Sequence, residues 1–263
     1  MTPAKPVVEQ RRERRKLLRA ALVAAAGGAL AGCDALGRDE TVLKVLRSTE
    51  TLTKGAHRLV GRKAMAQEFA PADVAPVFRA NGTTMPPGDE YAAMVKEQFA
   101  SWRLQVDGLV EQPLALSLAE LRAMPARTQI TRHDCVEGWS CIGQWKGVRL
   151  SHLLQLARPK PEAKFVLFHC LDQMDADDED SAYYESVDLD DALHEQTILA
   201  WELNGKPLPV ENGAPLRARI ERQLGYKQPK YLSRIELVTG FADRGKGRGG
   251  YWEDQGYTWY GGI

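Results

Sequence analysis

The sequence predicts a domain built from short β-strands and short α-helices, and three observations support this prediction. The 263 residues are 44% hydrophobic and 27% charged, which suits one sizeable globular domain or two small ones. From Trp102 onward, short apolar runs end at Gly, Pro, Asn or Asp, as strands and hairpins do. Between these runs lie segments with helical capping or helical apolar spacing. Residues 34–75, in contrast, have no sustained apolar period, and we expect a tether and an irregular arm there.

The predicted strands share one pattern, a short apolar run bounded by turn residues. They are 103–110, 114–116, 129–131, 164–170, 198–203 and 232–238. The first contains a turn at Asp107-Gly108, and the fifth ends in Asn204-Gly205, which is a hairpin signal. The run at 164–170 is apolar throughout, as expected of a strand that is buried on both faces.

Short helices are predicted between these strands, over 117–124, 150–157 and 189–194. Ser117, followed three residues later by Glu120, is a capping box that opens the first helix. The second helix carries apolar residues on one face from Leu150 to Ala157, and we expect residues 145–148 to form the turn that leads into it. Asp188 is the expected N-cap of the third helix.

The formal net charge is zero, but the charge is distributed unevenly. Residues 1–19 carry seven Lys and Arg side chains against two Glu, and the remainder carries 28 basic against 33 acidic residues, a net charge of −5. A net acidic body of this kind disfavours nucleic-acid binding.

The N-terminal segment has the features of an export signal. Residues 14–19 (Arg-Arg-Lys-Leu-Leu-Arg) resemble a twin-arginine signal, and the apolar run at 20–31 is too short to span a membrane as a mature helix. Residues 30–33 (Leu-Ala-Gly-Cys) resemble a bacterial lipobox, which predicts a possible lipid anchor at Cys33. We therefore expect residues 1–33 to be a signal of the twin-arginine or lipoprotein type; a basic amphipathic helix is the alternative.

Residues 131–140 (Thr-Arg-His-Asp-Cys-Val-Glu-Gly-Trp-Ser) are the most informative segment. A thiolate is a soft ligand suited to a transition metal, and Arg132 and His133 are expected to favour the ionised form of the Cys135 thiol. The alternative is a buried cysteine that serves only packing.

The run Cys-Val-Glu-Gly-Trp-Ser resembles the cofactor-ligand loop of the sulfite oxidase family of mononuclear molybdenum enzymes. Residues 207–217 (Pro-Leu-Pro-Val-Glu-Asn-Gly-Ala-Pro-Leu-Arg) and 225–231 (Gly-Tyr-Lys-Gln-Pro-Lys-Tyr) resemble two further segments of that family, and residues 76–87 resemble its N-terminal arm. The resemblance covers residues 76–243. It implies an α+β fold, a sulfite-oxidase-type molybdopterin-binding domain of mixed short strands and helices.

The resemblance also implies the site residues. Cys135 would be the metal ligand and the catalytic residue. The residues implied in cofactor binding are Asn81, Cys135, Cys170, Asn212, Arg217, Lys227, Gln228, Pro229 and Lys230. Arg217, Lys227 and Lys230 would form an anion site for the cofactor phosphate. For Asn81 an ordinary Asn-Gly turn, and for Cys170 a buried structural thiol, remain the alternatives.

The implied function is that of an exported oxidoreductase that holds molybdenum and molybdopterin and transfers an oxygen atom in a two-electron reaction. The expected substrate is a small or protein-borne sulfur compound, and the periplasmic methionine sulfoxide reductase catalytic subunits are the most similar branch. A membrane-anchored lipoprotein that binds an anion or cofactor without turnover is the alternative. A zinc hydrolase using Cys135, His133 and His169 would lack any recognised ligand spacing.

Electrons would have to come from a separate protein on the periplasmic face of the membrane, because the sequence has no Cys-x-x-Cys-His motif and no four-cysteine cluster. The expected partner is a cytochrome or a membrane haem protein. Residues 172–195 hold eleven Asp and Glu and no Lys or Arg, which predicts either a docking surface for that partner or an ordinary solvated surface. The Gly- and aromatic-rich tail, 244–263, is expected to fasten the C-terminus rather than to cover a pocket.

Overall fold

The computed structural model describes Lys16 and residues 40–175, 178 and 181–263. The predicted export signal and Cys33 lie outside the described residues. The chain divides into two units, Met1–Ala56 and His57–Ile263. Within the described parts of the chain, no helix has both the length and the apolar character that crossing a bilayer requires.

The first described element is helix α2, Glu40–Gly61. This helix corrects the expectation of an irregular segment over residues 34–75. Val42, Val45 and Leu52 recur at spacings of three and seven residues, which places them on one face of a helix. The Thr and Ser residues between them obscured this period.

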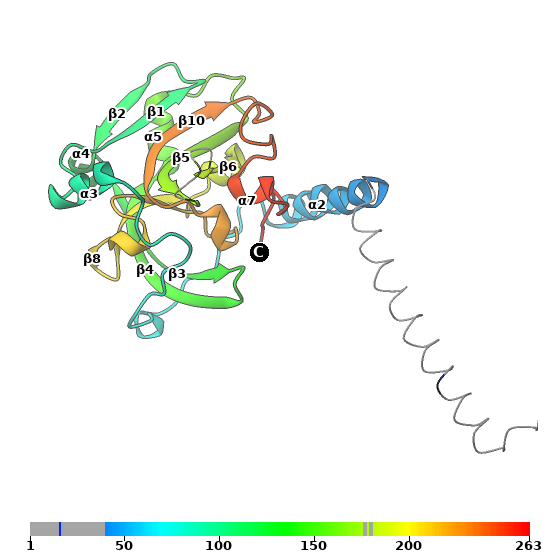
Figure 1. Ribbon diagram of the computed structural model, residues 1–263, viewed down its shortest axis with the longest axis horizontal. Coiled ribbons are helices and arrows are strands. Elements are labelled where there is room, and N and C mark those ends of the chain that lie inside the picture. Colours follow the sequence, from blue (N-terminus) through cyan, green and yellow to red (C-terminus); the bar gives the residue numbers. More distant parts are fainter. Residues whose placement is uncertain (1–15, 17–39, 176–177, 179–180) are drawn as a thin grey trace, which may run out of the picture. The chain divides into compact units, whose positions relative to one another are not determined.

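Two five-stranded sheets form the body of the second unit (Figure 1). The first has the order β2-β1-β10-β5-β6. Its strands are β1 (Arg103–Gly108), β2 (Leu114–Ser117), β5 (Phe165–Gln173), β6 (Ala182–Asp188) and β10 (Leu232–Val238). Among the described strands, β1 and β10 are the one parallel pair, with Gln105 opposite Arg234. The fold is α+β, as predicted.

The second sheet has the order β3-β4-β7-β8, and β9 pairs with β7. Its strands are β3 (Ala126–Cys135), β4 (Trp139–Arg149), β7 (Ile198–Leu203), β8 (Lys206–Pro207) and β9 (Arg217–Arg219). The hairpin between β7 and β8 turns at Asn204 and Gly205, both with positive φ, as the sequence predicted. Residues 145–148 were expected to form a turn, but they continue β4, because Gly147 allows the backbone to approach Leu199 closely.

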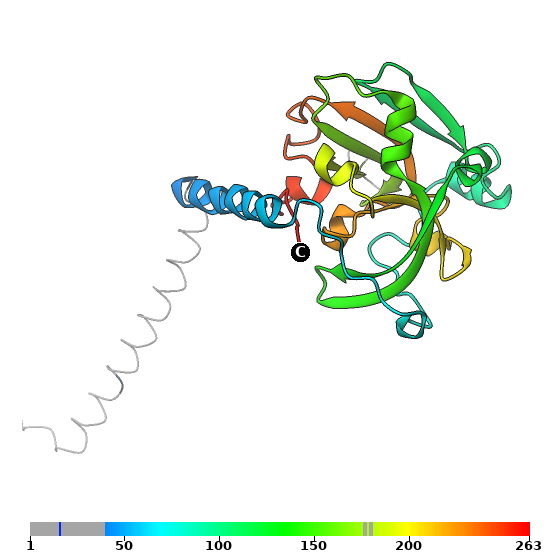
Figure 2. The same ribbon diagram turned by 180° about the vertical axis from the view of Figure 1, so that it is seen from behind.

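Short helices connect and cover these sheets. They are α3 (Asp89–Lys96), α4 (Leu118–Ala123), α5 (Leu150–Ala157), α6 (Leu189–Ala192) and α7 (Tyr251–Asp254), with 3-10 turns η1 (Pro71–Asp73), η3 (Val210–Asn212) and η4 (Gly225–Lys227). The capping box of Ser117 and Glu120 and the Asp188 cap of α6 are both present. α5 buries its predicted apolar face against the first sheet, in front of which it lies in Figure 2.

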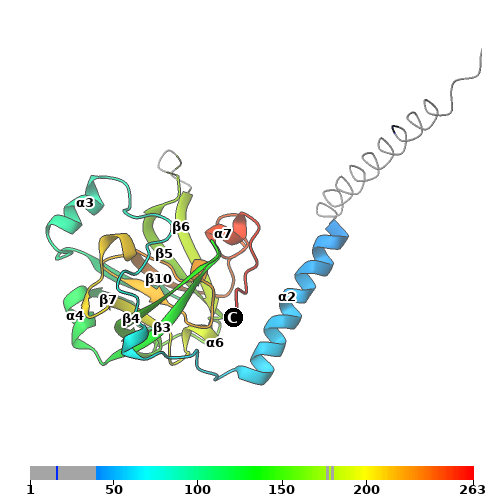
Figure 3. The same ribbon diagram turned by 90° about the horizontal axis from the view of Figure 1, so that it is seen from below.

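Two hydrophobic clusters stabilise the second unit. The larger one joins α4, α5 and the inner faces of β1, β5 and β10, and includes the buried indoles of Trp102 and Trp201. The smaller one surrounds Trp145, which is fully buried together with Phe78 and Leu203. The long β3–β4 hairpin carries its turn, residues 136–138, toward the C-terminal segment with α7 (Figure 3).

Candidate active site

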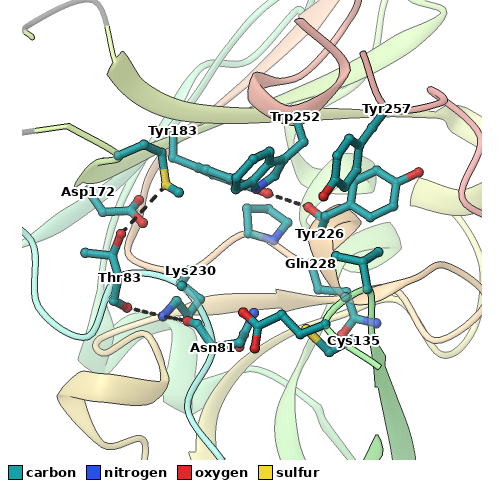
Figure 4. Close-up of a pocket in the computed structure, with 16 residues that line it drawn as sticks. Asn81, Thr83, Cys135, Asp172, Tyr183, Tyr226, Gln228, Lys230, Trp252 and Tyr257 are labelled. Carbon is teal, nitrogen blue, oxygen red and sulfur yellow. Dashed lines mark hydrogen bonds between the residues drawn. The ribbon is translucent and has the colours of Figure 1, made fainter. Parts of the chain in front are cut away.

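A cavity of about 150 Å³ lies where five segments of the second unit meet (Figure 4). These segments are the arm before α3, the β3–β4 turn, the end of β5 with the start of β6, the η4 region and the C-terminal tail. The residues that line the cavity include Asn81, Cys135, Glu137, Asp172, Met174, Tyr183, Tyr226, Gln228, Pro229, Lys230, Trp252 and Tyr257. The cavity therefore joins the N-terminal arm, the cysteine loop and the lysine-rich turn that the sequence had singled out.

Cys135 is the last residue of β3, and its thiol lies in the cavity wall. Gly138, with φ of +85°, allows the tight turn that sends the chain back into β4. Burial raises the pKa of the Cys135 thiol, and the Arg79 guanidinium opposes this increase. In the protein alone the thiol is therefore kept protonated, and binding of a metal would have to displace that proton.

The sequence assigned the activation of this thiol to Arg132 and His133, and this assignment was wrong. The Arg132 guanidinium is paired with Asp134 at 2.8 Å. The His133 side chain is fully buried, and its Nδ1 accepts a hydrogen bond from Arg219 at 3.0 Å. Burial and the nearby Arg219 lower the pKa of His133 well below its usual value, so its imidazole is neutral. Within the described residues no group of three or more His, Cys, Asp and Glu side chains could hold a metal ion, which leaves the zinc alternative without a ligand set.

Lys230 is a cation in the opposite wall of the cavity. Its Nζ donates hydrogen bonds to the carbonyl oxygens of Asn81 at 2.6 Å, of Thr83, and of Glu211 at 3.3 Å. Burial and the neighbouring Arg217 lower the pKa of Lys230 to about 7, although the Asp172 carboxylate opposes this decrease. The lysine thus ties the N-terminal arm to the turn after η3, and its charge is incompletely compensated.

Arg217 does not line the cavity, but it braces the segments that do. Its fully buried guanidinium donates to the carbonyl oxygens of Asn212 at 3.0 Å and of Gln228 at 3.4 Å. It lies over the Trp145 ring at 5.1 Å, as Arg219 does at 4.4 Å. Burial and Arg219 lower the pKa of Arg217 to about 9. Arg219 is paired with Glu221 at 2.7 Å, whereas the described residues provide no carboxylate partner for Arg217.

Several predicted cofactor-binding residues have buried polar atoms without a partner. Among the described residues, these include Asn81 Oδ1, Asn212 Nδ2 and Arg217 Nε. A buried polar atom without a hydrogen bond is costly, and native proteins seldom retain one unless a ligand or water satisfies it. Of these three residues only Asn81 lines the cavity, as do Gln228 and Pro229, and the Pro229 carbonyl accepts a hydrogen bond from the Ala218 amide at 2.9 Å. The unpaired atom of Asn81 fits a polar group bound in the cavity, whereas Asn212 and Arg217 lie buried outside its lining.

Lys227 was predicted to bind phosphate, and the structure contradicts this prediction. Its ammonium group is fully buried between Glu185 and Glu253, and the Nζ to Oε1 distance to Glu253 is 2.6 Å. These two carboxylates raise the pKa of Lys227, although burial opposes them. Lys227 points into the body, whereas its neighbours Tyr226 and Gln228 line the cavity.

Cys170 also lies outside the first cavity. It borders a second cavity of about 760 Å³, together with His169, Tyr184 and Arg244. Tyr183 lines both cavities and separates them. Burial raises the pKa of the Cys170 thiol well above its usual value, so this thiol is neutral.

The acidic segment 172–195 is less exposed than its composition indicated. Its members bind cations from elsewhere in the chain: Asp188 and Asp191 pair with Arg58 at 2.9 and 2.8 Å, and Glu185 with Lys227. Asp190 pairs with Arg62 and Glu195 with Arg127. Asp177, Glu179 and Asp180 lie outside the described residues. The ion pairs explain much of this acidic composition as internal structure.

Sequence reasoning missed the cavity's aromatic and acidic lining. Trp252 and Tyr257 were expected only to fasten the tail, yet both line the cavity, whereas Trp259 packs on Phe165 and Phe241 as fastening requires. Asp172 also lines it, and burial raises the pKa of this carboxyl to about 6. The dense aromatic composition of the tail was the one available signal. It did not indicate which rings face the cavity.

The cavity has the Cys135 thiol in one wall and the Lys230 ammonium group in the other, with the buried Arg217 behind it, as expected of a cofactor-binding oxidoreductase domain. Residues 91–244 match the family model described as "Oxidoreductase molybdopterin binding domain", and the chain belongs to this family. The protein is thus an oxidoreductase of the sulfite oxidase family, as its cysteine loop indicated.

Two named relatives and one solved structure are similar to this chain. The chain is 41% identical over 198 residues to "Putative protein-methionine-sulfoxide reductase subunit YedZ1" of Azospira oryzae, covering 74% of this chain and 70% of that protein. It is 35% identical over 146 residues to "Protein-methionine-sulfoxide reductase catalytic subunit MsrP" of Campylobacter jejuni, covering 52% of this chain and 49% of that one. The solved sulfane dehydrogenase SoxCD from Paracoccus pantotrophus matches with a TM-score of 0.47 and 25% identity, covering 53% of this chain and 39% of that one. The chain thus spans about half the length of its MsrP relative.

Proposed function

We propose that this protein binds molybdenum and molybdopterin and catalyses a two-electron oxygen-atom transfer to or from a sulfur compound. One observation carries this proposal. Arg217 and Lys230 are two buried cations, Arg217 lies close enough to lower the pKa of Lys230, and neither forms an ion pair with a carboxylate at close range among the described residues. A buried charge without a counter-charge is costly. A bound phosphate group would supply the missing negative charge.

The residues would divide the cofactor between them. Cys135 would supply a thiolate to molybdenum, because a soft sulfur ligand suits a transition metal. Lys230 and Arg217 would neutralise the phosphate, and the unpaired atoms of Asn81 and Asn212 would bind polar edges of the pterin. Gln228 and Pro229 would pack alongside it, whereas Lys227 would act only as a support. Cys170 would contact the cofactor only if the cofactor extends past Tyr183 into the second cavity.

When bound, the cofactor would supply the oxygen-atom and two-electron chemistry, and the protein supplies orientation, charge and exclusion of water. The cavity is lined by apolar rings on one side, and the half-buried Cys135 lies in its wall. Neutral His133, held by Arg219, keeps the β3 end rigid behind the thiol. Burial raises the pKa of Asp172 to about 6, so this carboxyl can hold a proton inside the cavity at mildly acidic pH and is mostly ionised at neutral pH.

The substrate we propose is an uncharged sulfur compound such as a thioether or its sulfoxide, either small or carried on a protein. Two relatives are named as protein-methionine-sulfoxide reductases or subunits of one. The cavity supports the same class, because Glu137 and Asp172 line it and its one lining cation, Lys230, is bound to three carbonyl oxygens. An anionic substrate would meet more negative than available positive charge.

We also propose that the protein is exported by the twin-arginine route and acts on the periplasmic face of the membrane, with a possible lipid anchor at Cys33. The molybdopterin-binding domain would extend over residues 76–243, with residues 34–75 as a tether that contains α2. Electrons would be exchanged with a separate cytochrome or membrane haem protein, and the acidic segment 172–195 would be its docking surface.

The decisive experiment measures molybdenum and pterin in protein produced in a host that makes the cofactor. We expect about one molybdenum per folded chain in the wild type. Cys135→Ser should leave the protein folded but nearly inactive, because a hard hydroxyl replaces the soft thiolate. Lys230→Ala should be molybdenum-poor, and Lys206→Ala, which removes an exposed lysine in β8, should retain the metal. Full activity of Cys135→Ser with molybdenum bound, or full occupancy in Lys230→Ala, would contradict the assignment.

A further inference from the structure

Three aromatic side chains form a continuous wall on one side of the cavity (Figure 4). Trp252 and Tyr257 are stacked, with ring centroids 5.2 Å apart and planes at 29°. Tyr226 meets Tyr257 edge to face at 5.3 Å. Tyr226 comes from η4, and the other two come from the C-terminal tail. The tail therefore supplies most of an apolar surface that faces the Cys135 side of the cavity.

This wall is held in place by buried polar contacts. The Tyr226 hydroxyl donates to the Thr258 carbonyl at 2.8 Å, and Gly256, with φ of +110°, makes the turn between Trp252 and Tyr257. Behind the wall, Glu253 accepts a bond from Lys227 at 2.6 Å. Contacts on both flanks of Trp252 and Tyr257 mean that the two rings are positioned before any substrate arrives.

The two sides of the cavity differ in chemical character. Glu137, Asp172 and Lys230 are on or near the side of the N-terminal arm and the cysteine loop, whereas the tail side presents ring faces. Sulfur next to an aromatic ring is favourable, and methyl and methylene groups pack well on ring faces. A sulfur atom that carries two alkyl groups can thus place its reacting side toward the cysteine and its alkyl groups against the rings.

We propose that Trp252 and Tyr257 are specificity-determining residues that bind the non-reacting alkyl groups of an uncharged thioether or sulfoxide. This inference rests on the proposed function for the reaction and adds the surface that selects the substrate. It assigns the aromatic tail a binding role in addition to fastening the terminus. The two rings act on substrate affinity and leave the chemical step to the cysteine side.

Kinetics of the holoenzyme with an uncharged methionine sulfoxide derivative, N-acetylmethionine sulfoxide methylamide, test this role. Trp252→Leu and Tyr257→Leu should each raise KM by roughly three- to tenfold, the size of a lost sulfur–aromatic contact, with kcat changed less than about twofold. Trp252→Phe, which keeps a ring, should restore most of the affinity. Tyr260→Leu is the matched control, because this tail aromatic lines a different cavity, and its KM should stay at the wild-type value.

A second readout does not depend on turnover. Titration with the thioether product, N-acetylmethionine methylamide, should change the tryptophan fluorescence of the wild type, and Trp252→Phe should lose that change. A fluorescence change that persists in Trp252→Phe, or a wild type that never responds, overturns the proposal.

The two hypotheses fail separately. Unchanged KM values in both leucine variants would remove the wall from substrate binding while sulfoxide turnover by the wild type upheld the proposed function. Protein without molybdenum and without turnover of any sulfur compound would refute the proposed function, and the fluorescence titration would then decide whether the wall binds thioethers.

Discussion

Replacing Lys227 by methionine should strongly destabilise the fold without directly touching the cavity. Among the described residues, the ammonium group of Lys227 is the one cation that pairs with Glu185 and Glu253, and all three side chains are essentially inaccessible to water. Burial raises the pKa of Glu185 well above its usual value, and the second carboxylate adds to that effect. The two carboxylates raise the pKa of Lys227, so the lysine is charged despite its burial. Methionine would leave them with no counter-charge.

The magnitude follows from the cost of breaking a buried ion pair. Removing one partner of such a pair typically costs about 3–5 kcal/mol, because the remaining charge stays buried. For a unit of this size, each kcal/mol lowers the midpoint of thermal unfolding by roughly 2–4 °C, so Tm should fall by about 6–20 °C. The loss of stability in the variant should be smaller at low pH. A carboxyl group whose pKa is raised by folding favours the folded state when it is protonated, and this contribution to stability is lost as pH rises through the folded pKa.

Thermal unfolding followed by circular dichroism, with molybdenum measured on the same samples, is the assay. The variant Lys227→Met/Glu185→Gln/Glu253→Gln removes the uncompensated charges and should recover about half or more of the lost Tm. A lost phosphate contact, which is the role predicted from the sequence, would instead lower molybdenum content and would not be rescued by the two glutamines. A Tm within about 2 °C of the wild type for Lys227→Met, or no rescue, would refute the ion-triad argument.

Three further outcomes are expected. The pKa of Lys230 is about 7 in the folded protein against about 10.4 in an unfolded chain. Between these two pH values the unfolded state binds more protons, so the stability of the cofactor-free protein should rise with pH. Denaturant titrations should show a smaller rise for Lys230→Met, and equal slopes of stability against pH in the variant and the wild type would contradict this expectation. Gly213→Ala should reduce molybdenum content, since φ is +111° and an added Cβ would lie 2.7 Å from Lys230 Cβ; normal occupancy would show that the turn can relax. Reduction by a basic cytochrome should slow with added salt, whereas reduction by an uncharged dye should not. If this part of the segment is the docking surface, the difference in salt dependence between cytochrome and dye should disappear when Asp177, Asp178, Glu179 and Asp180 are neutralised.

Much of the fold was predictable because its elements carry local signals. The capping box at Ser117, the one-sided apolar face of α5 and the Asn204-Gly205 turn each specify their structure within a few residues. The long β4 strand and helix α2 were missed for opposite reasons. In β4, Gly147 looks like a turn residue, yet it serves the close approach of β7. In α2, polar β-branched residues interrupt an apolar period that is nevertheless helical.

The site was predictable where the sequence resembles a family, and unpredictable where partners are distant. Cys135, Lys230, Gln228, Pro229 and Asn81 come together in one cavity, although Asn81 and Lys230 are 149 residues apart. The role of Lys227 depends on two carboxylates from β6 and α7, which no spacing rule brings together. The charge state of Cys135 likewise follows from burial, a tertiary property that neighbouring residues in the sequence do not reveal.

The position of β10 affects when the protein can mature. This strand follows all the other described strands in the sequence, yet it occupies the middle of the first sheet and joins β1 to β5. A ribosome must therefore synthesise the chain past Val238 before this sheet can close, because among the described strands β10 is the partner of β1 on that side. The cavity is completed later still, by Trp252 and Tyr257. Cofactor insertion must then follow translation, and in the proposed exported protein the signal leaves the ribosome long before there is a folded body to transport.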